Sequence, residues 1–188
     1  MLRHKWFVFL ACLEYRVPLW IAICHDWDKF LPDEWFAYAR CFYDAEGNKQ
    51  YVKSPEFAHA WMLHQHRNKH HWQYWLGVTF GAENCGAPLR CTDYMVWDSG
   101  QINRVVSRES VVTILAPNPC DFINVDQAMP DVYRREMLAD WIGAGRALGK
   151  PKTWEWYEAN KDNMLIHTET RAWIEAELAK RQHRAGGC

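Results

Sequence analysis

The chain of 188 residues carries 22 Lys and Arg against 23 Asp and Glu, so its formal charge is −1. This balance excludes a nucleic-acid binder that works through bulk positive charge. A composition of 49% apolar and 24% charged residues excludes an intrinsically disordered chain. The length suggests one domain, which we expect to span residues 1–188.

Helices are expected through the first 76 residues. The first runs from His4 to about Tyr15, and a second opens with Pro18 in its first turn and runs toward Phe30. A third is expected over residues 34–43, and Gly47-Asn48 closes it as a turn. A Ser N-cap followed by Pro and Glu starts a fourth helix, which should run from Ser54 to about Leu76.

The segment from about 77 to 127 changes character, because Gly and Pro residues interrupt its helical periodicity. Aromatic and β-branched residues are concentrated in Cys91–Trp97 and Ser110–Leu115, with Asp98-Ser99-Gly100 as a turn. We therefore expect a β-hairpin or small sheet inserted between helices.

Helix then resumes to the end of the chain. Pro130-Asp131 opens a segment that ends near Leu148-Gly149, and Pro151 starts a short helix to about Asn160. A last helix is expected from about Thr168 to His183, where Gly186-Gly187 ends it. The predicted fold class is all-α, mainly helical, with a small β-hairpin or loop insertion at about 77–127.

The seven cysteines are scattered without paired Cys-x-x-Cys spacing, which is typical of reduced thiols in a cytoplasmic protein and excludes a zinc ribbon. The apolar run Trp6–Leu13 has eight residues before a charged break at Glu14, whereas a membrane-spanning helix needs about 20. We therefore expect a cytoplasmic protein with no membrane partner, and a signal segment at the start is the lesser alternative.

Histidine and carboxylate residues form the first candidate sites. His25-Asp26 ends the apolar run 17–24, and charged groups are seldom buried unless they are paired or bound to a metal. On a helix the two side chains would point about 100° apart, so both could reach one metal in a wide polar cleft.

Two stripes compete on the expected helix over 54–76. The favoured stripe, at spacings of three and four, consists of Phe57, Trp61, His64, Asn68, His71 and Trp75. The competing stripe carries His59, His66 and His70 on an adjacent face. Flanking aromatic residues indicate burial of the first stripe, and a basic, solvated helix is the alternative.

Glu136 and Asp140 lie four residues apart in an apolar setting, and two such carboxylates repel unless a metal or a basic group lies between them. The alternative is a pair of ordinary surface acids beside Arg134 and Arg135. His4 is a lone histidine, which is more often a packing or surface residue than a metal ligand. We expect it to be a ligand only if the other three sites bind a metal.

Taken in order, His4, His25-Asp26, His64 or His71, and Asp140 resemble the HD-domain superfamily of metal-dependent phosphohydrolases. The core ligands of that superfamily are a His, a His-Asp doublet and a distant Asp on separate helices. The pattern looks like an HD-like branch found in bacteria and their phages, and it covers most of residues 4–145 apart from the insertion. The resemblance implies an HD-domain-like helical bundle.

The resemblance also implies that His4, His25, Asp26 and Asp140 hold one divalent metal. His64 and His71 could complete a second metal site or grip a phosphate, with Asp26 as the bridging ligand. Nucleotidase members carry an acid one turn after the doublet, whereas this chain has Lys29, which could stabilise a phosphate instead. The general base stays open among a metal-bound hydroxide, Glu136 and a His.

The residues are therefore assigned as follows: Lys29, Glu136 and His71 as catalytic, His4, His25, Asp26, His64 and Asp140 as metal ligands, and Asn68 and His70 as substrate-binding. We expect metal-dependent hydrolysis of a small phosphate ester, with a nucleotide as the favoured substrate and one or two ions of Mn, Mg, Zn, Co or Fe. The alternatives are an HD-like di-iron oxygenase and a non-catalytic protein stabilised by its metal. The expected partner is a small anionic substrate rather than bulk nucleic acid, and the oligomeric state is left open, a homodimer included.

Overall fold

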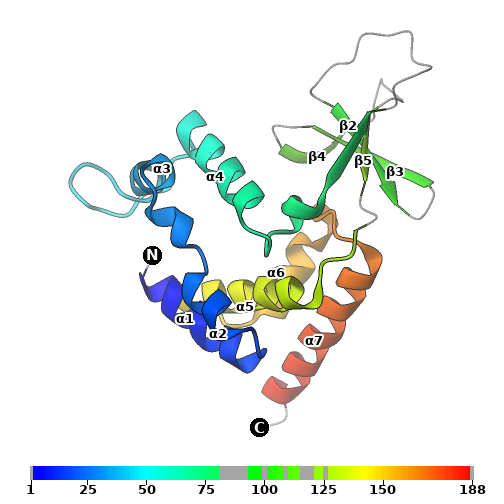
Figure 1. The fold of residues 1–188 in the computed structure, drawn as a ribbon. Coiled ribbons are helices and arrows are strands. Elements are labelled where there is room, and N and C mark those ends of the chain that lie inside the picture. Colours follow the sequence, from blue (N-terminus) through cyan, green and yellow to red (C-terminus); the bar gives the residue numbers. More distant parts are fainter. Residues whose placement is uncertain are drawn as a thin grey trace. The chain divides into compact units, whose positions relative to one another are not determined.

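The computed structural model describes the backbone of residues 2–80, 93–98, 101–107, 110–114, 121–124 and 127–186, and the side chains of 2–76 and 127–186. Before the strands come α1 (Leu2–Glu14), α2 (Leu19–Cys24), the 3-10 helix η1 (Trp27–Phe30), α3 (Pro32–Phe42), α4 (Pro55–Arg67) and the 3-10 helix η2 (Trp72–Trp75) (Figure 1). After the strands come α5 (Asp131–Ala147), α6 (Thr153–Asn160), the 3-10 helix η3 (Lys161–Asn163) and α7 (Thr168–Gly186). The prediction of a mainly helical chain is confirmed.

The expected β-structure between the helices is larger than a hairpin. One sheet contains β1 (Gly77–Phe80), β2 (Asp93–Asp98), β3 (Gln101–Ser107), β4 (Ser110–Ile114) and β5 (Asp121–Asn124). The strand order is β1-β5-β2-β3-β4, in which β2 and β5 run parallel and the other neighbours run antiparallel.

Two of these strands were expected from the sequence, since β2 and β4 match the two segments rich in β-branched and aromatic residues. The expected turn falls between β2 and β3, where Asp98 pairs with Gln101, and its residues 99 and 100 lie outside the described part of the chain. β1 and β5 have only four residues each, and β3 mixes polar with apolar residues, so their local signal is weak.

The chain divides into two compact units. Unit 1 consists of residues 1–74 and 135–151, and unit 2 consists of residues 75–134 and 152–188. The boundary therefore falls within α5. The single domain expected from the length stays a prediction.

In unit 1, α1 and α5 pack in close contact. α1 buries Val8, Ala11 and Cys12, and α5 buries the apolar residues 137–139 and 142 together with Gly143. A Cβ atom at Gly143 would lie 2.5 Å from Val8 Cγ2 and 2.6 Å from Val8 Cα. Only glycine fits there, and this close approach holds the turn of α5 that carries Asp140 against α1.

Two helices end earlier than predicted, and both ends lie at candidate site residues. α2 ends at Cys24 because His25 leaves the helical region and Asp26 takes a left-handed conformation with φ 54°. Asp is one of the few residues other than Gly that tolerate this conformation. The prediction that His25 and Asp26 lie on a continuous helix is therefore wrong.

α4 begins as predicted, because the Ser54 hydroxyl accepts a hydrogen bond from the Phe57 N–H at 3.2 Å. Its predicted continuation to Leu76 is wrong, since the helix ends at Arg67 and Asn68 has φ −107° and ψ 114°. The Asn68 side-chain amide donates hydrogen bonds to Asp28 Oδ2 and to the His64 carbonyl. These contacts stop the helix, so the helical stripe does not apply beyond Asn68.

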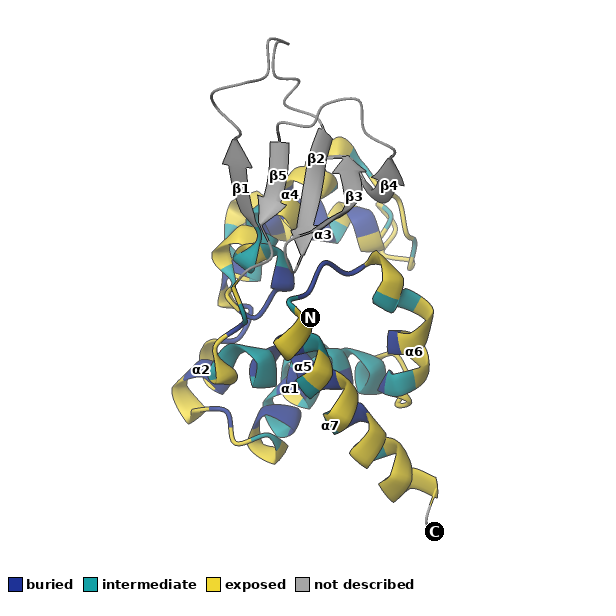
Figure 2. Cartoon of the chain, turned by 90° about the vertical axis from the view of Figure 1, so that its right-hand side faces the viewer, coloured by how far each residue is buried: buried dark blue, intermediate teal, exposed yellow. Residues whose placement is uncertain are grey.

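In unit 2, Tyr157 of α6 and Ile174 and Leu178 of α7 are buried, and the Thr170 hydroxyl accepts a hydrogen bond from the Met129 N–H at 3.0 Å. The rest of α7 is largely exposed (Figure 2). This helix begins at Thr168 as predicted and extends through Gly186, and Gly187 lies outside the described residues. Among the helices that the structure describes, none is long and apolar enough to cross a membrane.

Candidate metal centre

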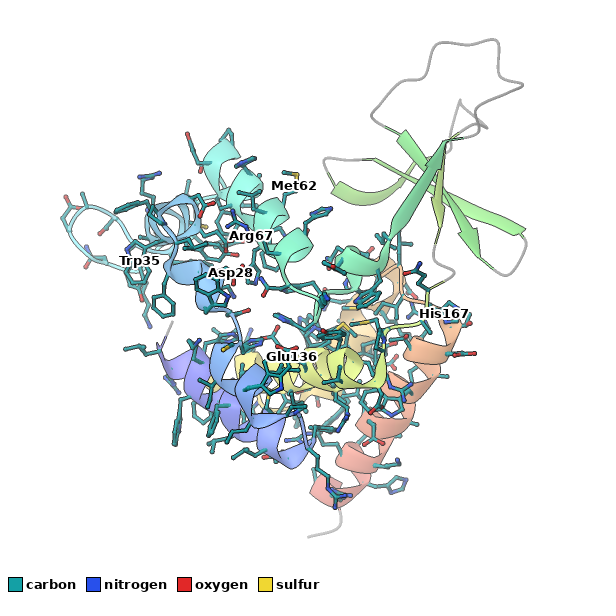
Figure 3. All side chains as sticks on the ribbon, viewed as in Figure 1. Asp28, Trp35, Met62, Arg67, Glu136 and His167 are labelled. Carbon is teal, nitrogen blue, oxygen red and sulfur yellow. The ribbon has the colours of Figure 1, made fainter. Side chains whose placement is uncertain are left out.

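Seven side chains with metal-binding atoms come together in unit 1 from five parts of its sequence. They are His4 on α1, His25 and Asp26 after α2, His64 on α4, His70 and His71 before η2, and Asp140 on α5. Figure 3 labels two carboxylates beside them, Asp28 on η1 and Glu136 on α5. The seven divide into two groups that share Asp26.

Site A consists of His4, His25, Asp26 and Asp140. His4 Nε2 lies 3.3 Å from Asp26 Oδ2 and 3.2 Å from Asp140 Oδ1, and His25 Nε2 lies 3.4 Å from each of the same two oxygens. All four donor atoms lie within 4.8 Å of one another, so they could bind one ion together.

Site B consists of Asp26, His64, His70 and His71. Asp26 Oδ1 lies 3.3 Å from His64 Nε2 and 3.4 Å from His70 Nε2. Asp26 thus presents Oδ2 to site A and Oδ1 to site B. A carboxylate placed in this way could bridge two ions, if ions bind there.

The fit of these residues to metal ions can be judged from their unpaired atoms. Six buried atoms of the two sites make no hydrogen bond: Nε2 of His25, His64, His70 and His71, and Oδ1 of Asp26 and Asp140. A buried polar atom without a partner costs about 1–3 kcal/mol, and folded proteins keep few of them. Divalent cations, whose ligands need free lone pairs, would pair with these six atoms, so the residues fit the group.

The carboxylates around the sites contact the other nitrogen of the same rings. Glu136 Oε1 lies 3.0 Å from His25 Nδ1 and 3.4 Å from His70 Nδ1. A histidine that binds a metal through Nε2 ordinarily donates its Nδ1–H to a carboxylate, which fixes the ring and its tautomer. Glu136 therefore orients one ligand of each site.

His64 is held in the same way on its Nδ1 side. Asp28 Oδ2 lies 3.0 Å and Glu34 Oε2 lies 3.1 Å from His64 Nδ1. The other Glu34 oxygen accepts a hydrogen bond from Arg67 at 2.8 Å. Asp28 and Glu34 both approach His64 at Nδ1, whereas site B involves Nε2 of the same ring. We therefore assign the two carboxylates to positioning His64.

Protonation in the cluster follows from burial and from opposite charges. Burial opposes ionisation of Asp26, but His25 and Lys29 hold the pKa of its carboxyl well below the usual range. For His71, burial together with the neighbouring His70 and His64 lowers the pKa well below that of a free imidazole. For His25, the neighbouring carboxylates outweigh burial and raise the pKa well above that of a free imidazole, and they also raise the pKa values of His4 and His64. Metal ions bind the neutral imidazole, so an ion bound here would displace protons from these three rings.

Lys29 places a positive charge at site A. Its ammonium donates a hydrogen bond to Asp26 Oδ2. Burial works against the charge, but Asp26 and Asp140 raise the pKa of Lys29 above its ordinary value. The side chain is thus a fixed cation beside the site A ligands.

The structure brings together every residue that the sequence assigned as a metal ligand. His71, which the resemblance offered as a residue of a second metal site, lies in the same cluster, and His70, which was assigned to substrate binding, joins it. Asn68 lies against Asp28 and His64, and Glu136 against two histidine rings. Asp28, Glu34 and Arg67 were not predicted as site residues. Of the three, only Asp28 has a sequence signal, because it follows Asp26 by two residues.

Residues 1–113 and 117–180 match the model of a family described as a family of unknown function, DUF5662. The search of curated proteins found no match. The search of solved structures found none either. The resemblance to the HD-domain superfamily stays a prediction.

Proposed function

The chain belongs to the DUF5662 family, and we propose that it is a metal-dependent hydrolase of a small phosphate ester with a two-metal centre bridged by Asp26. The observation that carries this proposal is the placement of the two Asp26 oxygens in two separate sets of histidine ligands. Divalent ions bound there would polarise a phosphoryl oxygen and lower the pKa of a bound water.

The protein's own side chains supply the rest of the chemistry. The Lys29 ammonium at site A can bind a non-bridging phosphate oxygen, since lysine acts as a point charge toward phosphate. His4 and Asp140 are partly exposed, so a small anionic substrate would reach the cluster from the site A side. Glu136 holds the rings of His25 and His70 in position.

The test measures metal content and hydrolysis on the same samples. The protein loaded with Mn²⁺ or Zn²⁺ should release phosphate from p-nitrophenyl phosphate or a nucleoside monophosphate. Asp26→Ala and Asp140→Ala should lose metal and activity together, whereas His59→Ala, an exposed histidine on α4, should keep both. Phosphate release that survives in Asp26→Ala would contradict the proposal.

A second function is favoured by one observation, the five imidazoles among the seven ligand residues. Imidazole-rich sets suit Fe, Zn and Cu better than Mg, which prefers oxygen ligands. A di-iron oxygenase is therefore the second candidate. It predicts that Fe²⁺-loaded protein consumes O₂ in the presence of its substrate and releases no phosphate from any ester.

A further inference from the structure

The two sites differ in donor set and in burial, and we propose that site B is a closed site that takes up the first ion and retains it, while site A exchanges its ion. This inference rests on the proposed metal centre and adds an order of loading to it. It makes site A the place where substrate and the second ion enter.

The donor sets are unequal. Site B offers three imidazoles and one carboxylate oxygen, whereas site A offers two imidazoles and two carboxylate oxygens. Both sites have four candidate protein ligands, so they differ in the type of donor rather than in the number. Nitrogen-rich sets bind Zn²⁺ and Fe²⁺ in preference to Mg²⁺ and Mn²⁺, so the two sites should also differ in the ion that they prefer.

The two most exposed ligands both belong to site A, although His25 of site A is as buried as the site B rings. The side chains of His64 and His70 are 0% and 3% exposed, whereas those of His4 and Asp140 are 23% and 15% exposed. An ion leaves a site through water or a competing ligand that reaches it. Water therefore has access to site A, and an ion in site B is shielded from it.

The site B rings are also fixed before an ion arrives. Asp28 and Glu34 hold His64 through Nδ1, and the Trp61 ring stacks on His64 with centroids 5.7 Å apart. Trp61 also meets the edge of His71, at 5.4 Å between centroids. His71 Nε2 is buried without a hydrogen bond, so this histidine is a ready ligand that needs no partner displaced. A site whose ligands are already ordered binds its ion with less entropic cost.

The experiment titrates Zn²⁺ into the metal-free full-length chain and counts bound ions by native mass spectrometry. The wild type should fill in two steps, the first tighter than the second. His4→Ala and Asp140→Asn should keep the first step and lose the second.

His71→Ala and the milder His71→Gln should weaken the first step by more than the roughly 10–100-fold that loss of an orienting partner causes. The control His59→Ala should bind Zn²⁺ as the wild type does.

Release kinetics provide a second readout that does not depend on the stability of any one variant. With excess chelator, the wild type should release one ion quickly and one slowly, and the slow phase should persist in His4→Ala and vanish in His71→Gln. Two equal steps, or a first ion lost in His4→Ala and kept in both His71 variants, would overturn the order of loading and leave the metal centre standing. A wild-type chain that binds no ion would overturn the proposed function itself.

Discussion

Asp26 is the residue on which both sites depend. It sits in a left-handed turn, is buried, and contacts four histidine rings and Lys29. Its conformation directs one carboxylate oxygen to each side of the cluster. A residue used in this way cannot be replaced by its amide, because an amide offers one oxygen and one nitrogen that carries hydrogens.

Asp26→Asn should therefore abolish metal binding at both sites. A ligand that binds only the folded state stabilises it by about 2.7 kcal/mol at a concentration of 100 times Kd. The variant should lose this stabilisation, measured as the shift of the melting temperature on addition of Zn²⁺. Glu158→Gln, which removes an exposed carboxylate on α6, is the control. A Zn²⁺-dependent shift of wild-type size in Asp26→Asn would show that the ions bind elsewhere.

Glu136 and Asp28 provide a matched pair of positioning residues. Glu136→Gln should weaken both ions, because Glu136 Oε1 contacts a ring of each site. Asp28→Asn should weaken the site B ion alone, because Asp28 contacts His64. The expected loss is about 10–100-fold in affinity per affected site, measured by competition with a chelator of known affinity. Equal effects of the two variants on both ions would contradict these roles.

At the scale of elements, the contact of α1 with α5 holds His4 and Asp140 together. Each of these ligands lies within one turn of the residues that meet at the close approach, Val8 and Gly143. Gly143→Ala would drive a methyl group into the Val8 backbone, which cannot yield as a side chain can. The structure thus predicts that a single methyl group, remote from the donor atoms, disturbs site A.

Gly143→Ala should cost about 1–3 kcal/mol of unfolding free energy, as overpacking does, and should weaken the site A ion more than the site B ion. Urea denaturation and Zn²⁺ titration measure the two effects. Gly186→Ala is the control, because a Cβ there would meet nothing within 4 Å. If both alanine variants were as stable as the wild type, the close approach of α1 and α5 would be refuted.

The starts of the helices could be predicted from the sequence, whereas the ends of α2 and α4, which lie at the site, could not. Ser54 and its Pro and Glu neighbours act locally, so α4 starts where the pattern indicates. Its end depends on the contact of Asn68 with Asp28, which is 40 residues away in sequence. A helical wheel that ran through Asn68 therefore put His70 on the competing stripe, although its Nε2 lies 3.4 Å from Asp26 Oδ1.

The site ligands were easier to predict than their surroundings. His4, His25, Asp26, His64 and Asp140 were predicted as ligands from residue type and order together with the resemblance to the HD-domain superfamily. The orienting role of Glu136 could not, because His25 and Glu136 are 111 residues apart and only the folded chain places them 3.0 Å from each other. Short strands were missed for the related reason that their pairing is long-range, as between β1 and β5.

At the scale of the whole molecule, the seven residues of sites A and B connect segments that are far apart in the sequence, from α1 to α5. Removal of metal leaves six buried polar atoms without partners, so the metal-free protein should melt several degrees below the metal-loaded protein, given that about 1 kcal/mol shifts a domain of this size by 2–4 °C. Thermal melts with and without a chelator measure this difference. Identical melting temperatures would mean that the cluster is not a metal site.

The most direct measurement is a crystal structure of Zn²⁺-loaded protein with anomalous diffraction recorded at the zinc edge. The account predicts two anomalous peaks, one on each side of the Asp26 carboxylate, between the donor atoms of site A and of site B. No peak at Asp26, or a peak only among Asp28, Glu34 and His64 Nδ1, would contradict the bridged two-metal centre.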